Sequence, residues 1–122
     1  MATDNIGMNL SLVAAADLSA KQFLVVKADS AGKAALAGAS DTNQIGIVQN
    51  KPTAGQTATI RFAGVSKAAA GGTIAAGGAV TSDSAGKVIA ATTGKQIIGT
   101  ALTGGVSGDV ITVLLINRGA SA

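Results

Sequence analysis

Several residue types are missing from the 122-residue sequence, which has no cysteine, histidine, glutamate, tryptophan or tyrosine. The absence of cysteine excludes a disulfide framework and thiolate metal ligands. The usual general bases and nucleophiles are thereby reduced to six aspartates and seven lysines, most of them in expected turns. We therefore predict a protein that is not an enzyme and has no catalytic residue, no cofactor and no metal site.

Aromatic and charged residues are scarce. Phe23 and Phe62 lie inside apolar stretches and are assigned to the core, so they provide no platform for stacked bases, and the cations behind the net charge of +3 are spread along the chain. No apolar run approaches the roughly 18 residues that cross a bilayer, and the first 20 residues lack the basic n-region of a signal peptide. We expect no nucleic acid, no membrane and no small-molecule substrate as partner, and synthesis in a cytoplasm.

Glycine is abundant and indicates the fold class. Seventeen glycines stand beside a single proline. A glycine inside a helix costs about 1 kcal/mol, whereas tight turns and bulges tolerate it. The stretches between the glycines are short, apolar and rich in β-branched residues, which is typical of strands. We predict an all-β fold, with a small β-barrel or β-sandwich-like body.

The sequence DSAGK occurs twice, at residues 29–33 and 83–87. An aspartate that accepts backbone hydrogen bonds, followed by a glycine in the left-handed conformation, is typical of a hairpin turn. A phosphate-binding loop would need a further glycine before the Gly-Lys pair and a Ser or Thr after it, and neither copy has them. We therefore expect two exposed hairpin turns with Gly32 and Gly86 at positive φ.

The segments that follow the two DSAGK copies also match, which indicates an internal duplication. An Ile-Gly strand, a glycine turn and a final strand occur in the same order at residues 45–62 and 98–115. We place the repeats at residues 20–62 and 76–115, within one domain that covers residues 19–122. The strands expected are residues 22–28, 33–37, 45–49, 57–62, 64–68, 78–82, 87–91, 96–102 and 109–117, with a glycine-rich connection at 67–80.

Residues 1–18 lie outside both repeats, so we predict an extended N-terminal arm. Met8, Leu10 and Leu12 alternate with polar residues, a pattern typical of a strand that adds to the edge of a partner's sheet. The body should then fold without the arm.

The most apolar strand expected is DVITVLLIN at residues 109–117. A nearly continuous apolar strand is typically covered on both faces. Because the core of a small, alanine-rich domain is thin, we expect this strand to be buried partly against other copies of the chain. Val110, Val113 and Ile116 are the candidates for that subunit interface.

Three segments together resemble a known family. IGIV at residues 45–48, TAGQTATIRFAGV at 53–65 and SGDVITVLL at 107–115, with the glycine turns between them, are similar to the small capsid cement, or head decoration, proteins of tailed bacteriophages. The similarity covers roughly residues 19–117. The family has no catalytic motif, so the likeness lies in strand spacing and in the phrase around Gly55.

The resemblance implies homotrimers on the outer surface of a virion capsid, where they hold major capsid protein subunits together against the pressure of packaged DNA. The partners would be the major capsid protein and other copies of the chain, with Met8, Leu10 and Leu12 in contact with the capsid. Reinforcement should be non-covalent, because a lysine cross-link usually needs a carboxylate partner such as glutamate, which is absent.

Two other classes stay open at this point. A Gly/Ala-rich β subunit of a tail, fibre or surface layer would form open polymers instead of closed trimers. An enzyme or ligand-binding module would need Asp and Lys side chains that converge in a pocket.

Overall fold

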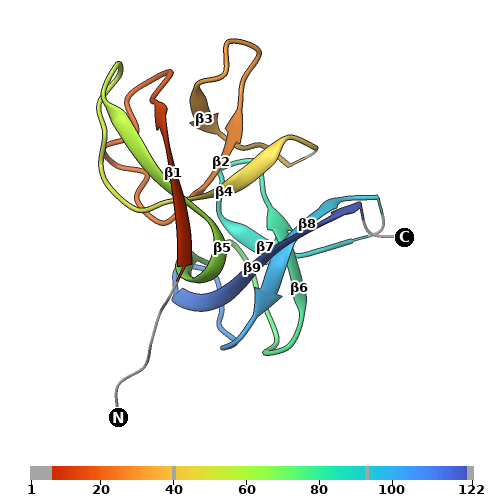
Figure 1. Ribbon diagram of the computed structural model, residues 1–122. Coiled ribbons are helices and arrows are strands. Elements are labelled where there is room, and N and C mark those ends of the chain that lie inside the picture. The colour runs from red at the N-terminus through yellow and green to blue at the C-terminus, as the bar shows by residue number, and fades with distance from the viewer. Residues whose placement is uncertain (1–6, 40, 93, 121–122) are drawn as a thin grey trace.

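The computed structural model describes residues 7–39, 41–92 and 94–120, which form nine strands and no helix (Figure 1). The strands are β1 (Gly7–Val13), β2 (Val25–Ala28), β3 (Ala34–Leu36), β4 (Gln44–Val48), β5 (Thr57–Ala69), β6 (Ala79–Ser82), β7 (Val88–Ala90), β8 (Gln96–Ala101) and β9 (Val110–Ala120). They pair antiparallel in one sheet that curls into a half-barrel, which confirms the prediction of an all-β fold. In the described part of the chain, no helix has the length and apolar character needed to span a membrane.

The two DSAGK segments form the same hairpin turn, between β2 and β3 and between β6 and β7. In each turn the Oδ1 atom of the aspartate, Asp29 or Asp83, accepts hydrogen bonds of 2.8–2.9 Å from the backbone N–H groups two and four residues later. The φ angles are +75° at Gly32 and +78° at Gly86. The predicted turn type and both positive φ angles are therefore confirmed.

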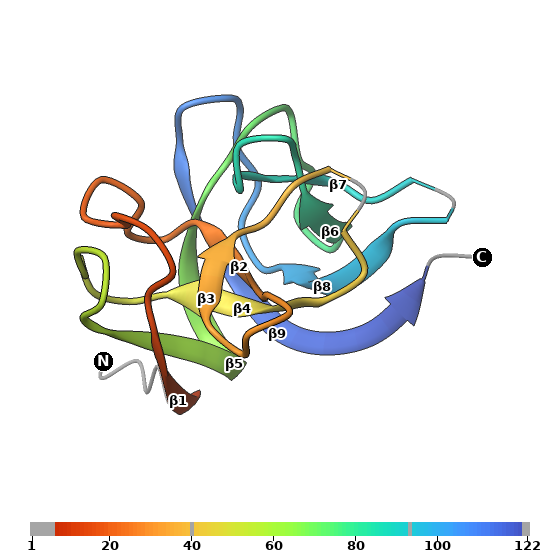
Figure 2. The ribbon, with the colours of Figure 1, turned by 90° about the horizontal axis from the view of Figure 1, so that it is seen from above.

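The two halves of the chain repeat one pattern of strand pairing. In the first half β2 pairs with β3 and β4, and β4 pairs with β5; in the second half β6 pairs with β7 and β8, and β8 pairs with β9. The order across the sheet is β3-β2-β4-β5-β9-β8-β6-β7, so the halves join where β5 lies beside β9. Seen from above, β2 to β4 lie on one side and β6 to β8 on the other (Figure 2). An internal duplication is expected to produce this arrangement.

The structural repeat begins earlier than the sequence indicated. β1 pairs with the first part of β5, and the second part of β5 pairs in the same way with β9. Directly after these segments, the N–H groups of Ala14 and Ala70 donate matching hydrogen bonds of 2.8 Å to the carbonyl groups of Gln56 and Asp109. β1 is therefore the first strand of the first half, and the second part of β5 is its counterpart.

Residues 7–18 consequently belong to the β body, which corrects the prediction of an arm that ends at residue 18. Ala14 and Leu18 are only 2% exposed and are members of the core. Equivalent residues are 54 positions apart at the DSAGK turns but 56 apart at Ala14 and Ala70, because the first half has two extra residues in between. That change of spacing hid the match. Residues 1–6 lie outside the described residues.

β5 is one long strand where the sequence predicts two, at residues 57–62 and 64–68. Its ladder with β1 skips Phe62, and Gly64 next to this bulge has φ +96°. A bulge bends a strand and increases its local twist. β5 therefore passes from the first half of the sheet to the second without interruption.

Buried side chains form two clusters that correspond to the two halves. The smaller cluster consists of Ala14, Leu18, Val26, Ala34, Val48, Ala58 and Ile60. Each of these has a counterpart in the larger cluster; Leu18, for example, corresponds to Ile74. Val25 and Ile47 of the first half pack into the larger cluster, which joins the two halves.

The two DSAGK turns differ in their surroundings. Gly32 is exposed and has open space where a Cβ would lie. Gly86 is buried, and a Cβ there would come within 2.5 Å of Leu36 Cδ1 and 3.1 Å of the Val25 carbonyl oxygen. The Gly86 carbonyl also accepts a hydrogen bond of 2.7 Å from the Val25 N–H. The second turn packs against the first half, so the prediction that both turns are exposed is wrong for Gly86.

A pair of buried glutamines also joins the halves. The Gln44 N–H donates to Gln96 Oε1, and Gln96 Nε2 donates to the Gln44 carbonyl, both at 2.9 Å. The two residues are 1% and 5% exposed. Because a buried polar group without a partner costs about 1–3 kcal/mol, this reciprocal pair favours one relative placement of the halves.

Candidate functional site

Exposed apolar side chains gather on β9 and on the connection before it. Leu102, Val106, Val110 and Ile116 are between 48% and 59% exposed. Val110 and Ile116 are an even number of residues apart and so belong to one face of β9. Val113 is fully buried in the larger core cluster. It cannot contact another subunit in this fold, which corrects its assignment to the subunit interface.

The three residues expected to contact a capsid are in β1, and the structure separates them. Met8 is 62% exposed. Leu10 and Leu12 are half-buried and pack against the smaller core cluster of their own chain. Met8 therefore offers most of its side chain to a partner, whereas Leu10 and Leu12 contribute to the body.

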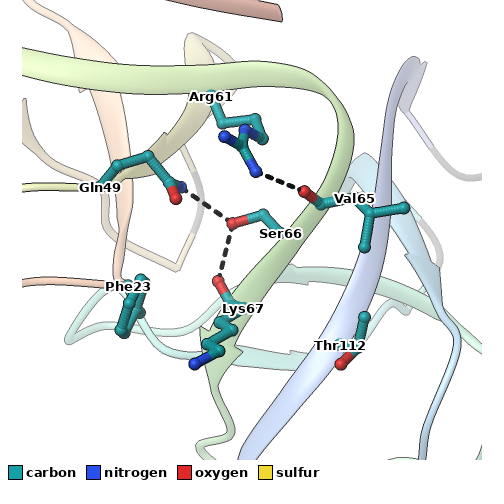
Figure 3. Close-up of a pocket in the computed structure, with 7 residues that line it drawn as sticks. All are labelled: Phe23, Gln49, Arg61, Val65, Ser66, Lys67 and Thr112. Atoms are coloured by element: carbon teal, nitrogen blue, oxygen red, sulfur yellow. Dashed lines mark hydrogen bonds between the residues drawn. The ribbon is translucent and has the colours of Figure 1, made fainter. Parts of the chain in front are cut away.

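A pocket of about 290 Å³ lies at the bend of β5 (Figure 3). Phe23 reaches it from the loop before β2, Gln49 from the position directly after β4 and Thr112 from β9. The complete lining is Phe23, Gln49, Arg61, Val65, Ser66, Lys67 and Thr112. The bend brings Arg61 and Ser66, on either side of Gly64, to the same cavity.

Hydrogen bonds hold the polar side chains of the pocket in place (Figure 3). Arg61 donates from Nη1 to the Val65 carbonyl at 2.8 Å and from Nε to Asn9 Oδ1 at 3.1 Å. Gln49 Nε2 donates to Ser66 Oγ at 2.9 Å, and that hydroxyl donates to the Lys67 carbonyl at 2.9 Å. The guanidinium is thus oriented before any ligand arrives.

Both charges in the pocket wall are positive. Arg61 and Lys67 line it, and no aspartate does. Lys67 Nζ lies 5.8 Å from the centroid of the Phe23 ring, within the range of a cation–π contact. The convergence of Asp with Lys that a catalytic or ligand-binding module would need is not present in this pocket. The arrangement suits a hydrogen-bond acceptor or an anion.

The backbone of Phe23 is strained. Among the described residues it is the one non-glycine residue at positive φ, +67°. Its counterpart is Gly77, with φ +86°. The Phe23 N–H donates to the Val48 carbonyl at 2.9 Å, as the Gly77 N–H donates to the Ala101 carbonyl at 2.7 Å. The left-handed conformation costs a residue other than glycine about 1–2 kcal/mol. Packing of the ring against the larger core cluster offsets part of that cost.

The carboxylates with shifted pKa values lie away from the pocket. Asp41 accepts a hydrogen bond of 2.7 Å from the Gly38 N–H and forms an ion pair of 3.0 Å with Lys27, and together these lower its pKa. Hydrogen bonds from Ser19 lower the pKa of Asp17. A lowered pKa keeps a carboxylate ionised, which suits turn stabilisation. The described residues contain no group of three or more acidic side chains that could hold a metal ion.

Sequence reasoning did not find this pocket. It assigned Phe23 to the core and treated Arg61 and Lys67 as part of an even spread of charge, because the lining residues are distant in sequence. One signal was available. The repeats at residues 20–62 and 76–115 already align Phe23 with Gly77 and Arg61 with Leu114, so the two copies differ in kind at these positions.

Comparisons with known proteins agree with the fold. A family model described as "Phage cement protein" matches residues 2–116. The chain is also similar to the crystal structure of the head fiber gp8.5 N base in bacteriophage phi29, with a TM-score of 0.67 and 16% identity over 96% of this chain and 99% of that chain. No curated protein matches. At 16% identity the structural likeness supports the fold alone.

Proposed function

The chain belongs to the phage cement protein family, and from this premise we propose that it binds the major capsid protein as a homotrimer and stabilises contacts between capsid subunits. It is a structural protein of the phage capsid surface and not an enzyme. The observation that carries the proposal is the family match over residues 2–116.

The exposed apolar side chains before and on β9 support a binding role. Full burial of a Val or Leu side chain contributes about 1.5–3 kcal/mol, and Leu102, Val106 and Val110 are each about half exposed. Covering the remaining surface of these three would therefore contribute on the order of 2–4 kcal/mol. Several large apolar side chains left exposed on one connection and the strand after it favour an interaction site there.

We assign Val110 and Ile116 to the contact between copies of the chain. They share one face of β9, and both are exposed. A closed ring needs the same surface on every copy to meet a second, complementary surface. The two side chains would supply the apolar part of that contact.

We assign Met8 and the outer edge of β1 to the capsid contact. β1 pairs with β5 alone among the described strands. An unpaired strand edge can accept a further strand through main-chain hydrogen bonds. In this proposal Met8 contacts the capsid protein, whereas Leu10 and Leu12 pack within the β body of their own chain.

The test is co-sedimentation with undecorated phage heads, followed by native mass measurement of the decorated particles. We expect saturable binding in multiples of three copies. Val110→Ser with Ile116→Ser should reduce trimers, whereas Val13→Ser, a comparable change on β1, should leave them intact. Open polymers without head binding would favour a tail, fibre or surface-layer subunit, and absence of binding would refute the proposal.

A further inference from the structure

Because the fold is duplicated, each residue of the pocket at the bend of β5 can be compared with the residue at the equivalent position of the other half. Residues that the fold itself requires recur in both halves. The DSAGK turns recur, and so do the glycine turns at Gly55 and Gly108, with φ of +84° and +95°. A residue that differs in kind between the halves therefore serves something other than the repeated turns and strands, such as the contact between the halves that Ile47 makes, or a binding site.

The pocket residues of the first half differ in this way. Phe23, Gln49 and Arg61 stand where the second half has Gly77, Leu102 and Leu114. The backbone hydrogen bonds at these positions are matched; the N–H of Gln49 donates to Thr59 at 2.7 Å, and that of Leu102 donates to Thr112 at 2.8 Å. Matched backbone positions thus carry Phe, Gln and Arg in the first half and Gly, Leu and Leu in the second.

Phe23 adds a second, independent observation. A glycine is free of strain at this backbone position, as Gly77 demonstrates, whereas Phe23 is held at φ +67°. Strained residues of this kind cluster at binding sites, where the surroundings maintain them. Besides packing against the larger core cluster, the Phe23 ring forms one wall of the pocket and lies 5.8 Å from Lys67 Nζ.

The chemistry of the lining selects a negatively charged ligand. Arg61 and Lys67 are donors without acceptor capacity. The bonds of Arg61 to Asn9 and Val65 use Nε and one N–H of Nη1, so the second N–H of Nη1 and those of Nη2 remain to pair with the two oxygens of a carboxylate. Charge-assisted hydrogen bonds of this type are about twice as strong as neutral ones. The volume of about 290 Å³ is at the small end of ligand sites, which suits one or two side chains better than a nucleotide.

We propose that this pocket receives an acidic side chain of the capsid shell protein. The carboxylate would lie between Arg61 and Lys67, with its methylene groups against Phe23 and Val65. The position supports a shell partner, because Arg61 Nε bonds Asn9 Oδ1 and the pocket therefore adjoins β1, the strand whose outer edge is assigned to the capsid contact. The net charge of +3 favours an acidic partner surface. This inference rests on the proposed function.

The experiment measures affinity for undecorated heads at several NaCl concentrations. Arg61→Leu introduces the residue found at the counterpart position, and Lys67→Gln removes the second charge; each should weaken binding about tenfold and reduce its salt dependence. Lys51→Gln, the same charge change at an exposed residue outside the pocket, should alter affinity less than about twofold. Melting curves report whether each variant is folded. If Arg61→Leu is unfolded, Arg61→Lys takes its place, since it retains the charge and loses the paired geometry.

Carbodiimide coupling on decorated heads identifies the partner, because it joins a lysine amine to a carboxylate in direct contact. We expect Lys67 to couple to an Asp or Glu of the shell protein, and we expect inorganic phosphate not to displace the protein at fixed ionic strength. If wild type binds heads and the pocket variants bind them with the same affinity and salt dependence, the inference is overturned and the proposed function stands. Displacement by phosphate alone would assign the pocket to a free anion. Failure of wild type itself to bind heads would refute both.

Discussion

Replacing Gly32 and Gly86 by alanine, one at a time, places the same substitution in the same turn in two different surroundings. Both glycines follow Asp-Ser-Ala, and their φ angles differ by only 3°, from +75° to +78°. The backbone cost of adding a Cβ should therefore be nearly equal in the two turns. Any difference in stability then measures the packing of the second turn against the first half.

The expected magnitudes follow from the space around each Cβ. Both variants incur the left-handed penalty of about 1–2 kcal/mol. Nothing lies within 4 Å of a Cβ at Gly32, so Gly32→Ala should cost no more than this. At Gly86 the Cβ meets Leu36 Cδ1 at 2.5 Å and the Val25 carbonyl oxygen at 3.1 Å, and overpacking of this kind adds about 1–3 kcal/mol. Gly86→Ala should therefore cost about 2–5 kcal/mol in total.

Urea unfolding at 25 °C measures both variants, with Tm as a second readout, for which each kcal/mol corresponds to about 4 °C in a domain of this size. Leu36→Ala provides a further control. In that background the side chain nearest to the added Cβ is absent, so the cost of Gly86→Ala should fall towards that of Gly32→Ala. Equal costs for Gly32→Ala and Gly86→Ala in the wild-type background would refute the proposed packing of the second turn against β2 and β3.

Two further predictions concern the body and its acid sensitivity. Leu18→Ala should lower the free energy of unfolding by about 2–5 kcal/mol because Leu18 is a core residue. Met8→Ala, at an exposed residue, should change it by no more than about 0.5 kcal/mol. If urea unfolding shows equally small effects for both variants, residues 7–18 are an arm and not part of the body. Asp41 has a lowered pKa in the folded state, so its contribution to stability is present above its unfolded pKa and is lost as pH falls through the folded pKa. Asp41→Asn should therefore lose less stability than wild type between pH 6 and pH 3, and an unchanged acid dependence would contradict this role.

Local sequence chemistry was sufficient for the turns. An Asx hydrogen bond and a glycine at positive φ involve atoms within a few residues of each other, so Gly32 and Gly86 could be placed without knowledge of the rest of the chain. The apolar stretches on both sides of each turn likewise predicted paired strands. Local sequence patterns could not predict the pocket, because Phe23, Arg61 and Thr112 come together only through the bend of β5 and its pairing with β9.

The errors of sequence reasoning have a common physical cause. Val113 and Ile116 have equally apolar side chains, yet one is fully buried and the other 48% exposed, since strand alternation assigns them to opposite faces of β9. Leu10 and Leu12 matched the pattern of a strand that awaits a partner, and their partner is β5 of the same chain. A sequence pattern indicates that an apolar face must be covered, but it does not indicate whether the same chain or another subunit covers it.

The sequence alone determined the all-β class, the two hairpin turns and the lack of the side chains on which common catalysis depends, because each follows from the chemistry of neighbouring residues or from composition. The tertiary structure alone decided that residues 7–18 belong to the body, that Gly86 is buried while Gly32 is exposed, and that Arg61 and Lys67 share a pocket with a strained Phe23. These outcomes depend on which distant segments pair and in which register. Identical pentapeptides whose glycines have φ angles of +75° and +78° therefore have different surroundings, since burial depends on the neighbours that the fold supplies.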